Sequence, residues 1–328
     1  MSSCYKSTNA LLKHLRTKHS IKISGGKQKK QLINQGYFHG YKGYRFFNKP
    51  TSTIPFTDYE QINQTILFDA KLKSIFYEKI MFIETAIKSI VLQAILDETK
   101  DESIDKMFQL VIQNYGKTDP FAVTIKEKRE AQQSYLNLRS FIISKIASEY
   151  KNGNPKVTHF YETNKTIPLW ALFDILMLGD FGRLYNSLTF DLRDKISKKF
   201  NIDKSIDSSR AVLGQYVYWL KDLRNEIAHN GIIYDARFKT FNPKKASIIT
   251  LEKAFSIIGI DFSEIGDFAL LIDFIELGLG VSVTERKNFV RQINSAVENF
   301  KVKIGETFFK SNFETKLTSR LSNYKVIR

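Results

Sequence analysis

The sequence predicts a mainly α-helical protein, and three observations support this. Apolar residues recur at three- and four-residue steps over long stretches, above all between residues 58 and 96. Of the 328 residues 43% are hydrophobic, with 26 Phe and 15 Tyr, which is enough for a substantial core. Charged residues interrupt the longest apolar runs, so no run reaches the ~20 residues that cross a bilayer. These interruptions are Asp174, Asp267, Asp273 and Glu276.

The first 57 residues predict a small α(+β) module. Leu11, Leu12 and Leu15 indicate a short helix, and the extended residues 21–23 that follow resemble a strand. A second short helix is expected over residues 27–34. Residues 48–57, with Pro50 and Pro55, are expected to form a linker.

Residues 58–250 predict a bundle of four or five long helices. The first begins at an Asp58 cap and continues to about residue 96. Glu84 and Lys88 on this helix have the spacing of a helical ion pair. Residues 155–166 are expected to be mostly polar loop. Further helices are expected over residues 104–115, 127–150, 170–188, 191–200 and 205–214, and the last of these leads into a helix that ends near Ile227.

Residues 251–328 are expected to form a C-terminal helical extension. Its main feature is a hairpin of helices over residues 265–277 and 284–300, joined by residues 278–283. The final ~25 residues show no clear periodicity.

The cysteine content and the N-terminus point to the cytoplasm. The single cysteine, Cys4, cannot form an intramolecular disulfide or a thiolate zinc cluster. The polar N-terminus lacks the apolar segment of a secretory signal. We therefore expect a soluble cytoplasmic protein that needs no metal or cofactor and does not insert into a membrane.

The positive charge is concentrated in the first sixth of the chain. The net charge is +16, and residues 1–57 hold eleven basic side chains and no acidic one. A local basic excess favours binding to a phosphate backbone. The alternatives are a solvated basic arm or weak attraction to anionic lipid. The candidate RNA-binding cations in this segment are Lys13, Arg16, Lys18, Lys27, Lys29, Lys30, Lys42 and Arg45.

Aromatic residues alternate with glycine and basic residues between positions 36 and 47. Tyr37, Tyr41 and Tyr44 are candidates for stacking on unpaired bases, with Lys42 and Arg45 on phosphates. Alternatively, these rings seal the N-terminal segment against the helical core. Arg237 and Lys239, on an expected loop or short strand over residues 237–241, are two further RNA-binding candidates.

The candidate catalytic residues lie at the end of an apolar helix. Asn230-Gly231 supplies a stop, so Arg224 and His229 fall in its last turns. Five residues apart, they diverge by ~140° and ~7.5 Å, and a single copy brings them together poorly. Two copies about a twofold axis can place both pairs in one cleft. The alternative is that both side chains only complement the last carbonyls and the helix dipole.

Such a cleft suits RNA cleavage without a metal. A histidine can transfer the proton of the 2′-hydroxyl or protonate the leaving oxygen. A guanidinium can hold the phosphate and the charge that develops on it. The sequence contains no P-loop, no Gly-x-Gly-x-x-Gly after a strand, no Gly-x-Ser-x-Gly and no His-Glu-x-x-His.

The segment Arg224-Asn225-x-x-Ala228-His229-Asn230-Gly231 resembles the Arg-polar-x-x-x-His signature of HEPN ribonucleases, in the form found in Abi-like (AbiD/AbiF type) abortive-infection proteins. The resemblance spans about residues 11–240. Upstream segments agree with it in order: Gly36-Tyr37-Phe38-x-Gly40-Tyr41, Phe68-Asp69-x-x-Leu72, Ile83-Glu84-x-x-Ile87-Lys88 and Pro168-Leu169-Trp170-x-Leu172.

This resemblance implies a HEPN-like helical bundle and a metal-independent endoribonuclease toxin in phage defence, acting as a homodimer. It assigns phosphate binding to Arg224 and proton transfer to His229, with Asn225 orienting one of them. The alternative is a non-catalytic HEPN protein that holds a structured noncoding RNA.

Overall fold

The computed structural model describes residues 7–239 and 242–322, and it is mainly α-helical as predicted. Within these residues there is no β-strand element, only isolated bridges. One connected set of buried apolar side chains extends from Leu12 to Leu317, with contributions from residues 1–57, 58–250 and 251–328. Among the described helices, none combines the length and apolar composition needed to cross a membrane.

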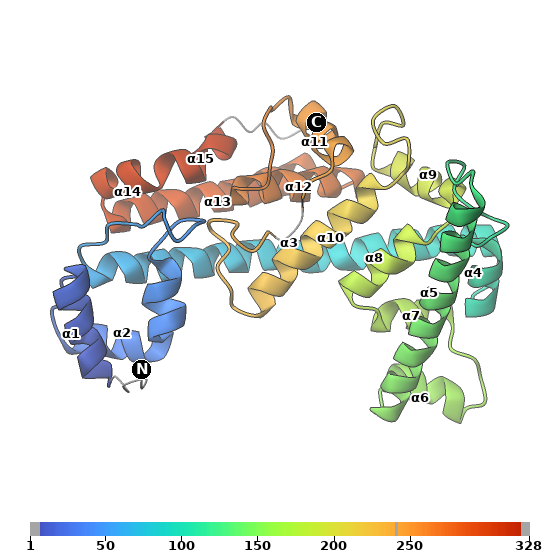
Figure 1. The fold of residues 1–328 in the computed structure, drawn as a ribbon, viewed down its shortest axis with the longest axis horizontal. Coiled ribbons are helices and arrows are strands. Elements are labelled where there is room, and N and C mark those ends of the chain that lie inside the picture. Colours follow the sequence, from blue (N-terminus) through green and yellow to red (C-terminus); the bar gives the residue numbers. More distant parts are fainter. Residues whose placement is uncertain (1–6, 240–241, 323–328) are drawn as a thin grey trace.

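The long helix α3 (Tyr59–Thr99) is the axis of the molecule (Figure 1). It begins at Asp58, whose side chain accepts the N–H of Glu60 while Gln61 completes a capping box. Its buried positions, among them Ile62 and Ile80, lie on more than one side because other helices pack around it. The prediction of this helix is therefore confirmed, with an end three residues beyond the expected one.

The C-terminal helices lie along one side of α3 (Figure 1). The predicted hairpin is present as α12 (Ile265–Gly278) and α13 (Val283–Ile304). Phe68 of α3 stacks on Phe300 of α13 with ring centroids 4.4 Å apart. Buried ion pairs link Lys79 to Glu276 and Arg286 to Asp273. Three further helices were not predicted: α11 (Lys245–Phe255), α14 (Glu306–Asn312) and α15 (Glu314–Ser322).

The N-terminal segment forms two helices and a π-helical turn at one end of α3. The expected helices are present, whereas the expected strand over residues 21–23 is reduced to one bridge between Lys22 and Asp58. Residues 48–57 are irregular as expected, although Ile54 and Phe56 within them are buried. The elements are α1 (Thr8–His19), α2 (Gly26–Gln35) and η1 (Tyr37–Lys42).

The prediction of one continuous helix over residues 170–188 is wrong. The helix is interrupted at Leu176 and Met177, which adopt extended backbone angles. Two contacts stabilise the break. Lys88 Nζ donates to the Leu176 carbonyl at 2.5 Å, and Asp180 accepts the N–H of Met177 at 3.2 Å. Lys88 also forms the predicted ion pair with Glu84, at 2.9 Å. The two halves are α7 (Leu169–Ile175) and α8 (Leu178–Asn186).

The remaining helices of the central region follow the prediction with three differences. The helix expected over residues 205–214 is wrong, because residues 205–211 form turns, with Arg210 in the left-handed conformation, and the next helix begins only at Val212, whose N–H donates to Asp207. The helix expected over 104–115 ends early, and Ile112 instead forms a bridge with Leu188. Residues 155–162 form a helix rather than a loop, since Asn154 caps it and Pro155 occupies its first turn. The elements are α4 (Ile104–Leu110), α5 (Ile125–Lys151), α6 (Pro155–Glu162), α9 (Phe190–Lys199) and α10 (Val212–Ala228).

The helix that carries the Arg224–His229 motif crosses the middle of the molecule. Helix α10 packs against α8 and α3, and its C-terminal end lies between α1 and α2 on one side and α5 and α6 on the other (Figure 1). Helices α1, α2 and α6 and the lower part of α5 lie on the side of α3 opposite α13–α15. The motif end of α10 is thus placed between the two projecting parts of the fold.

Candidate functional site

The motif helix ends where the sequence predicts. His229 is its C-cap, with its N–H donating to the Asn225 carbonyl at 2.9 Å. Asn230 then takes the left-handed conformation with φ of 55°. Glycine is required at position 231 for a different reason, because a Cβ there would lie 1.9 Å from Glu226 Oε1 and clash with it. That oxygen accepts the N–H of Ile232 at 3.1 Å and so fixes the chain that leaves the motif.

Arg224 and His229 are both at the surface end of α10. His229 is exposed and Arg224 is partly buried. The Arg224 Nη1 donates a long hydrogen bond of 3.4 Å to Asn225 Oδ1, while its Nε has no hydrogen-bond partner among the described residues. No hydrogen bond in the described structure joins Arg224 to His229. Asn225 contacts both, Arg224 through its side chain and His229 through its backbone carbonyl.

A buried carboxylate fixes the loop that follows the motif. Asp69 of α3 is fully buried, and its Oδ1 accepts the N–H groups of Ile233 at 2.9 Å and Tyr234 at 2.8 Å. Its Oδ2 accepts the Tyr44 hydroxyl and pairs with Lys73, both at 2.8 Å. Lys73 in turn donates to Asn230 Oδ1 at 3.0 Å. Through Asp69, the residues next to His229 are connected to both α3 and the N-terminal segment.

The basic side chains of α1 and α2 mostly face solvent. Lys13, Arg16, Lys18, Lys27 and Lys30 are exposed, and Lys29 is partly buried. Two of them have partners within the fold: Arg16 donates to the Ile23 carbonyl at 3.0 Å, and Lys27 lies 3.7 Å from Glu60. For Lys13, Lys18, Lys29 and Lys30, the described structure contains no ion pair. This surface is therefore cationic with little internal neutralisation.

The aromatic rings of the N-terminal segment divide into two groups. Tyr44 is buried, and its hydroxyl donates a hydrogen bond to Asp69. Its ring stacks on that of Tyr234, with centroids 5.9 Å apart, so Tyr44 is part of the core. Tyr41 is also buried, and its ring centroid lies 5.1 Å from that of His19. Tyr37 is partly buried, whereas Phe38 is 70% exposed.

A line of rings leads from this core to the surface. The ring centroids of Tyr41 and Tyr37 are 5.8 Å apart, and those of Tyr37 and Phe38 are 6.0 Å apart. Lys42 Nζ lies 4.5 Å from the Phe38 ring centroid. Phe38 was not among the sequence candidates, because only its exposure in the fold distinguishes it from the buried rings beside it.

The three other basic candidates have different surroundings. Arg45 is partly buried next to η1. Arg237 binds both carboxylate oxygens of Asp235, donates to the Gly43 and Phe46 carbonyls at 2.7 and 2.8 Å, and lies over the Phe46 ring. Lys239 donates to the Asp261 carbonyl at 2.5 Å. Arg237 thus joins the loop after the motif to the N-terminal segment. Thr240 and Phe241, the last two positions of the expected 237–241 segment, lie outside the described residues.

The position of His19 predicts a pH-dependent stability of the N-terminal segment. Burial, followed by the neighbouring charges of His14 and Arg45, lowers the pKa of His19 below its ordinary value. As pH falls below about 6.5, the unfolded chain takes up a proton that the folded chain resists, so stability decreases with falling pH. We expect the amide hydrogens of α1 to exchange faster at about pH 5.5 than at about pH 7.5, after correction for intrinsic rates.

The control for this prediction is a second histidine in the same segment. His19→Gln is expected to remove most of the acid-induced loosening. His39→Gln, at an exposed position, is expected to leave it unchanged. Equal loosening in the parent and in His19→Gln would show that another group is responsible.

Comparison with protein families identifies the family to which this chain belongs. A family model described as Abi-like protein matches residues 30–235, which include η1, Asp69 and the whole of α10. Because this match covers more than half of the chain, the protein belongs to the Abi-like family. Searches of curated proteins and of solved structures found no match. Membership of this family suggests a role in abortive infection, a form of phage defence.

Proposed function

We propose that this Abi-like protein is a metal-independent endoribonuclease toxin of the HEPN superfamily, of the AbiD/AbiF type, that acts in the cytoplasm during abortive infection. The observation that carries the proposal is the end of α10. There an exposed imidazole lies five residues from a guanidinium whose Nε has no hydrogen-bond partner in the described part of the chain, in a member of a defence family.

The proposed reaction uses the 2′-hydroxyl of RNA as the nucleophile. His229 takes the proton of the 2′-hydroxyl as its oxygen attacks the adjacent phosphorus. The bond from phosphorus to the 5′-oxygen breaks, and this oxygen takes up a proton. The products are a 2′,3′-cyclic phosphate and a 5′-hydroxyl. Arg224 binds the phosphate and stabilises the charge that develops on its oxygens. Asn225 orients both groups through its contacts to each.

A second copy of the chain completes the proposed site. Five residues apart on ideal helix geometry, Arg224 and His229 of one copy diverge by ~140°, and a twofold axis at the end of α10 would bring the two pairs together. Exposed apolar side chains on α3 support such a contact between two copies. Helix α3 is next to the end of α10, because its Lys73 donates a hydrogen bond to Asn230, the residue after His229. The exposed apolar side chains are Leu67, Tyr77, Met81 and Phe82, each at least 37% exposed.

The test is cleavage of matched nucleic acids by the purified protein in the presence of a metal chelator. We expect single-stranded RNA to be cut to fragments ending in 2′,3′-cyclic phosphate. An RNA with one 2′-deoxynucleotide is expected to resist cleavage at that position alone, and single-stranded DNA is expected to remain intact. Cleavage of DNA, or dependence on added metal, would contradict the mechanism.

A second candidate function is supported by the N-terminal surface. The cations of α1 and α2, together with Phe38, Tyr37 and Lys42, suit non-catalytic binding of a structured noncoding RNA. RNA that binds tightly in the same assay but is never cut would favour this second function. Cleavage and binding are also compatible, with the bound RNA restraining the nuclease.

A further inference from the structure

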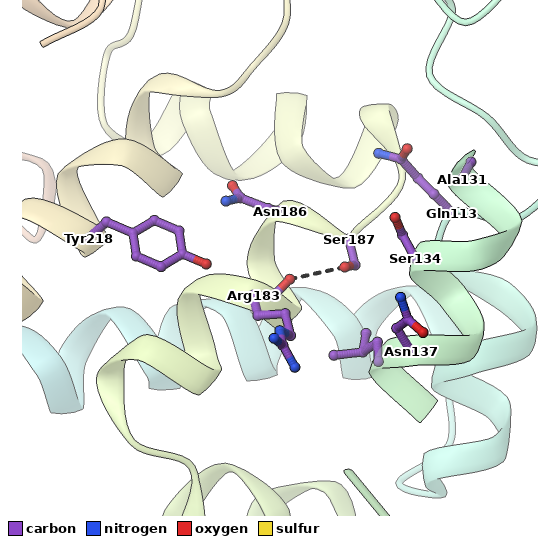
Figure 2. A pocket seen from close by; sticks show the side chains of 9 residues that line it. Gln113, Ala131, Ser134, Asn137, Arg183, Asn186, Ser187 and Tyr218 are labelled. Atoms are coloured by element: carbon purple, nitrogen blue, oxygen red, sulfur yellow. Dashed lines mark hydrogen bonds between the residues drawn. The ribbon is translucent and has the colours of Figure 1, made fainter. Parts of the chain in front are cut away.

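A polar pocket lies between α5, α8 and α10. It has a volume of about 330 Å³, and Figure 2 shows the side chains that line it. Those that matter here are Gln113, Asn137, Arg183, Asn186 and Tyr218. Ligand pockets start at about this size, so it can hold a group no larger than one nucleotide.

Among the described residues that line this pocket, Arg183 is the only charged one. Its guanidinium lies over the Phe141 ring, with Cζ 4.9 Å from the ring centroid, and the described structure contains no ion pair for it. Stacking on an aromatic ring leaves the planar fork of N–H donors free for a second partner. Because none of the described lining residues is a carboxylate that would neutralise Arg183, the pocket favours a monoanion.

The neutral side chains add hydrogen-bonding groups of both kinds. Asn137 Oδ1 accepts from Gln133 at 3.0 Å, which leaves the Asn137 amide N–H groups as donors. Gln113 Nε2 donates to the Leu188 carbonyl at 2.8 Å, which leaves Gln113 Oε1 as an acceptor. Donors and acceptors in one small pocket suit the edge of a nucleobase.

Two glycines allow the wall of the pocket to form. A Cβ at Gly182 would lie 3.1 Å from the Tyr218 ring, and a Cβ at Gly214 would lie 2.0 Å from Asn186 Oδ1. The absence of side chains at these two positions lets Tyr218 and Asn186 lie in the contact between α8 and α10. Tyr218 therefore presents a fixed, flat ring at the pocket.

The pocket and the motif share one face of α10. Tyr218 and His229 are eleven residues apart, which on a helix brings their directions within ~20° at a separation of ~16 Å along the axis. Asn225 lies between them on the same face. A strand whose scissile phosphate is at His229 can therefore reach the pocket a few nucleotides away.

We infer that this pocket is a subsite for one nucleotide of single-stranded RNA, with a phosphodiester on Arg183 and the base between Tyr218 and the amides of Gln113 and Asn137. The inference rests on the proposed function for its choice of RNA. It adds a position, away from the cleaved bond, at which the protein holds the strand and selects among bases.

The experiment measures RNA binding in a His229→Ala background, so that cleavage does not interfere. The probe is a short fluorescent single-stranded RNA, and anisotropy is followed at several salt concentrations. We expect Arg183→Gln to weaken RNA binding by about tenfold. The slope of log affinity against log salt concentration is expected to become shallower by about 1, the change for the loss of one phosphate contact. The control is Arg291→Gln, on the exposed surface of α13, which removes the same charge and is expected to bind like its parent.

A second measurement uses the parent protein and so does not depend on the folding of a variant. The parent protein is titrated with the four nucleoside 5′-monophosphates and with inorganic phosphate, and chemical shifts are followed by NMR. One nucleotide is expected to bind more tightly than inorganic phosphate and to perturb residues around Tyr218. Equal, unlocalised perturbation by all five probes would overturn the inference.

The outcomes separate this inference from the proposed function. If the parent never cuts RNA but Arg183→Gln weakens binding, the pocket stands and the nuclease assignment falls. If cleavage depends on His229 while Arg183→Gln binds and cuts RNA like the parent, the subsite is wrong and the nuclease stands.

Discussion

Replacing His229 by Ala is expected to lower the rate of RNA cleavage by about 10²- to 10⁴-fold, the usual contribution of a general acid or base. Arg224→Ala is expected to lower it by about 10²- to 10³-fold through loss of charge stabilisation at the phosphate. Because His229 is exposed and Arg224 has only a 3.4 Å hydrogen bond to Asn225, neither change should unfold the protein.

Matched controls separate a catalytic role from general loss of charge. His159→Ala on α6 and Arg291→Ala on α13 remove exposed residues of the same types far from the motif in sequence. Both are expected to cut RNA at the parent rate. Melting temperatures measured for all four variants would reveal any loss of fold. Parent-like cleavage by either motif variant would remove that residue from the mechanism.

Mixing the two inactive variants tests whether the site is shared. In a twofold cleft, a mixed dimer of Arg224→Ala and His229→Ala subunits keeps one arginine and one histidine. We expect such a mixture, unfolded and refolded together, to regain part of the parent activity. A mixture as inactive as its components would contradict a cleft in which one arginine and one histidine from either copy suffice.

The end of α10 could be predicted from sequence because all of its determinants are local. The apolar steps along the helix, the left-handed Asn230 and the closely packed Gly231 lie within a few residues of Arg224 and His229. The same holds for α3 and α5, whose capping boxes mark their first turns. Local signals of this kind placed most long helices within a few residues.

The features that escaped prediction depend on contacts between distant residues. The break between α7 and α8 is stabilised by Lys88, which is 88 residues away from Leu176. The partners of Asp69 on the loop after the motif are 164 and 165 residues away. The RNA-binding candidates show the same limit. Composition selects Tyr37, Tyr41 and Tyr44 alike, whereas only the packing shows that Tyr41 and Tyr44 are buried.

Asp69→Asn is expected to destabilise the protein by about 3–5 kcal/mol, the usual cost of removing one partner of a buried ion pair. The change keeps the size of the side chain but removes its charge. Lys73, whose side chain is 11% exposed, would then have no carboxylate partner among the described residues and would keep its hydrogen bonds to Asn230. Urea unfolding of the parent and the variant measures the difference.

An exposed pair provides the control for this substitution. Glu130 lies 4.0 Å from Lys126 on the surface of α5, and both side chains are more than half exposed. Glu130→Gln is therefore expected to leave the unfolding midpoint unchanged. Adding Lys73→Met to Asp69→Asn removes the uncompensated charge and is expected to restore part of the lost stability. If the double variant is no more stable than Asp69→Asn, the unpaired lysine is not the main cause.

The effect on cleavage should exceed the effect on stability under conditions where Asp69→Asn is still folded. Asp69 holds the chain immediately after His229 and accepts the hydroxyl of Tyr44 from the N-terminal segment, so its loss loosens both sides of the proposed RNA path. A folded Asp69→Asn protein is expected to cut RNA more slowly because the His229 side chain samples more positions. Faster amide exchange in residues 230–234 should accompany the slower cleavage. A folded variant with parent-like exchange and parent-like cleavage would show that the motif keeps its geometry without Asp69.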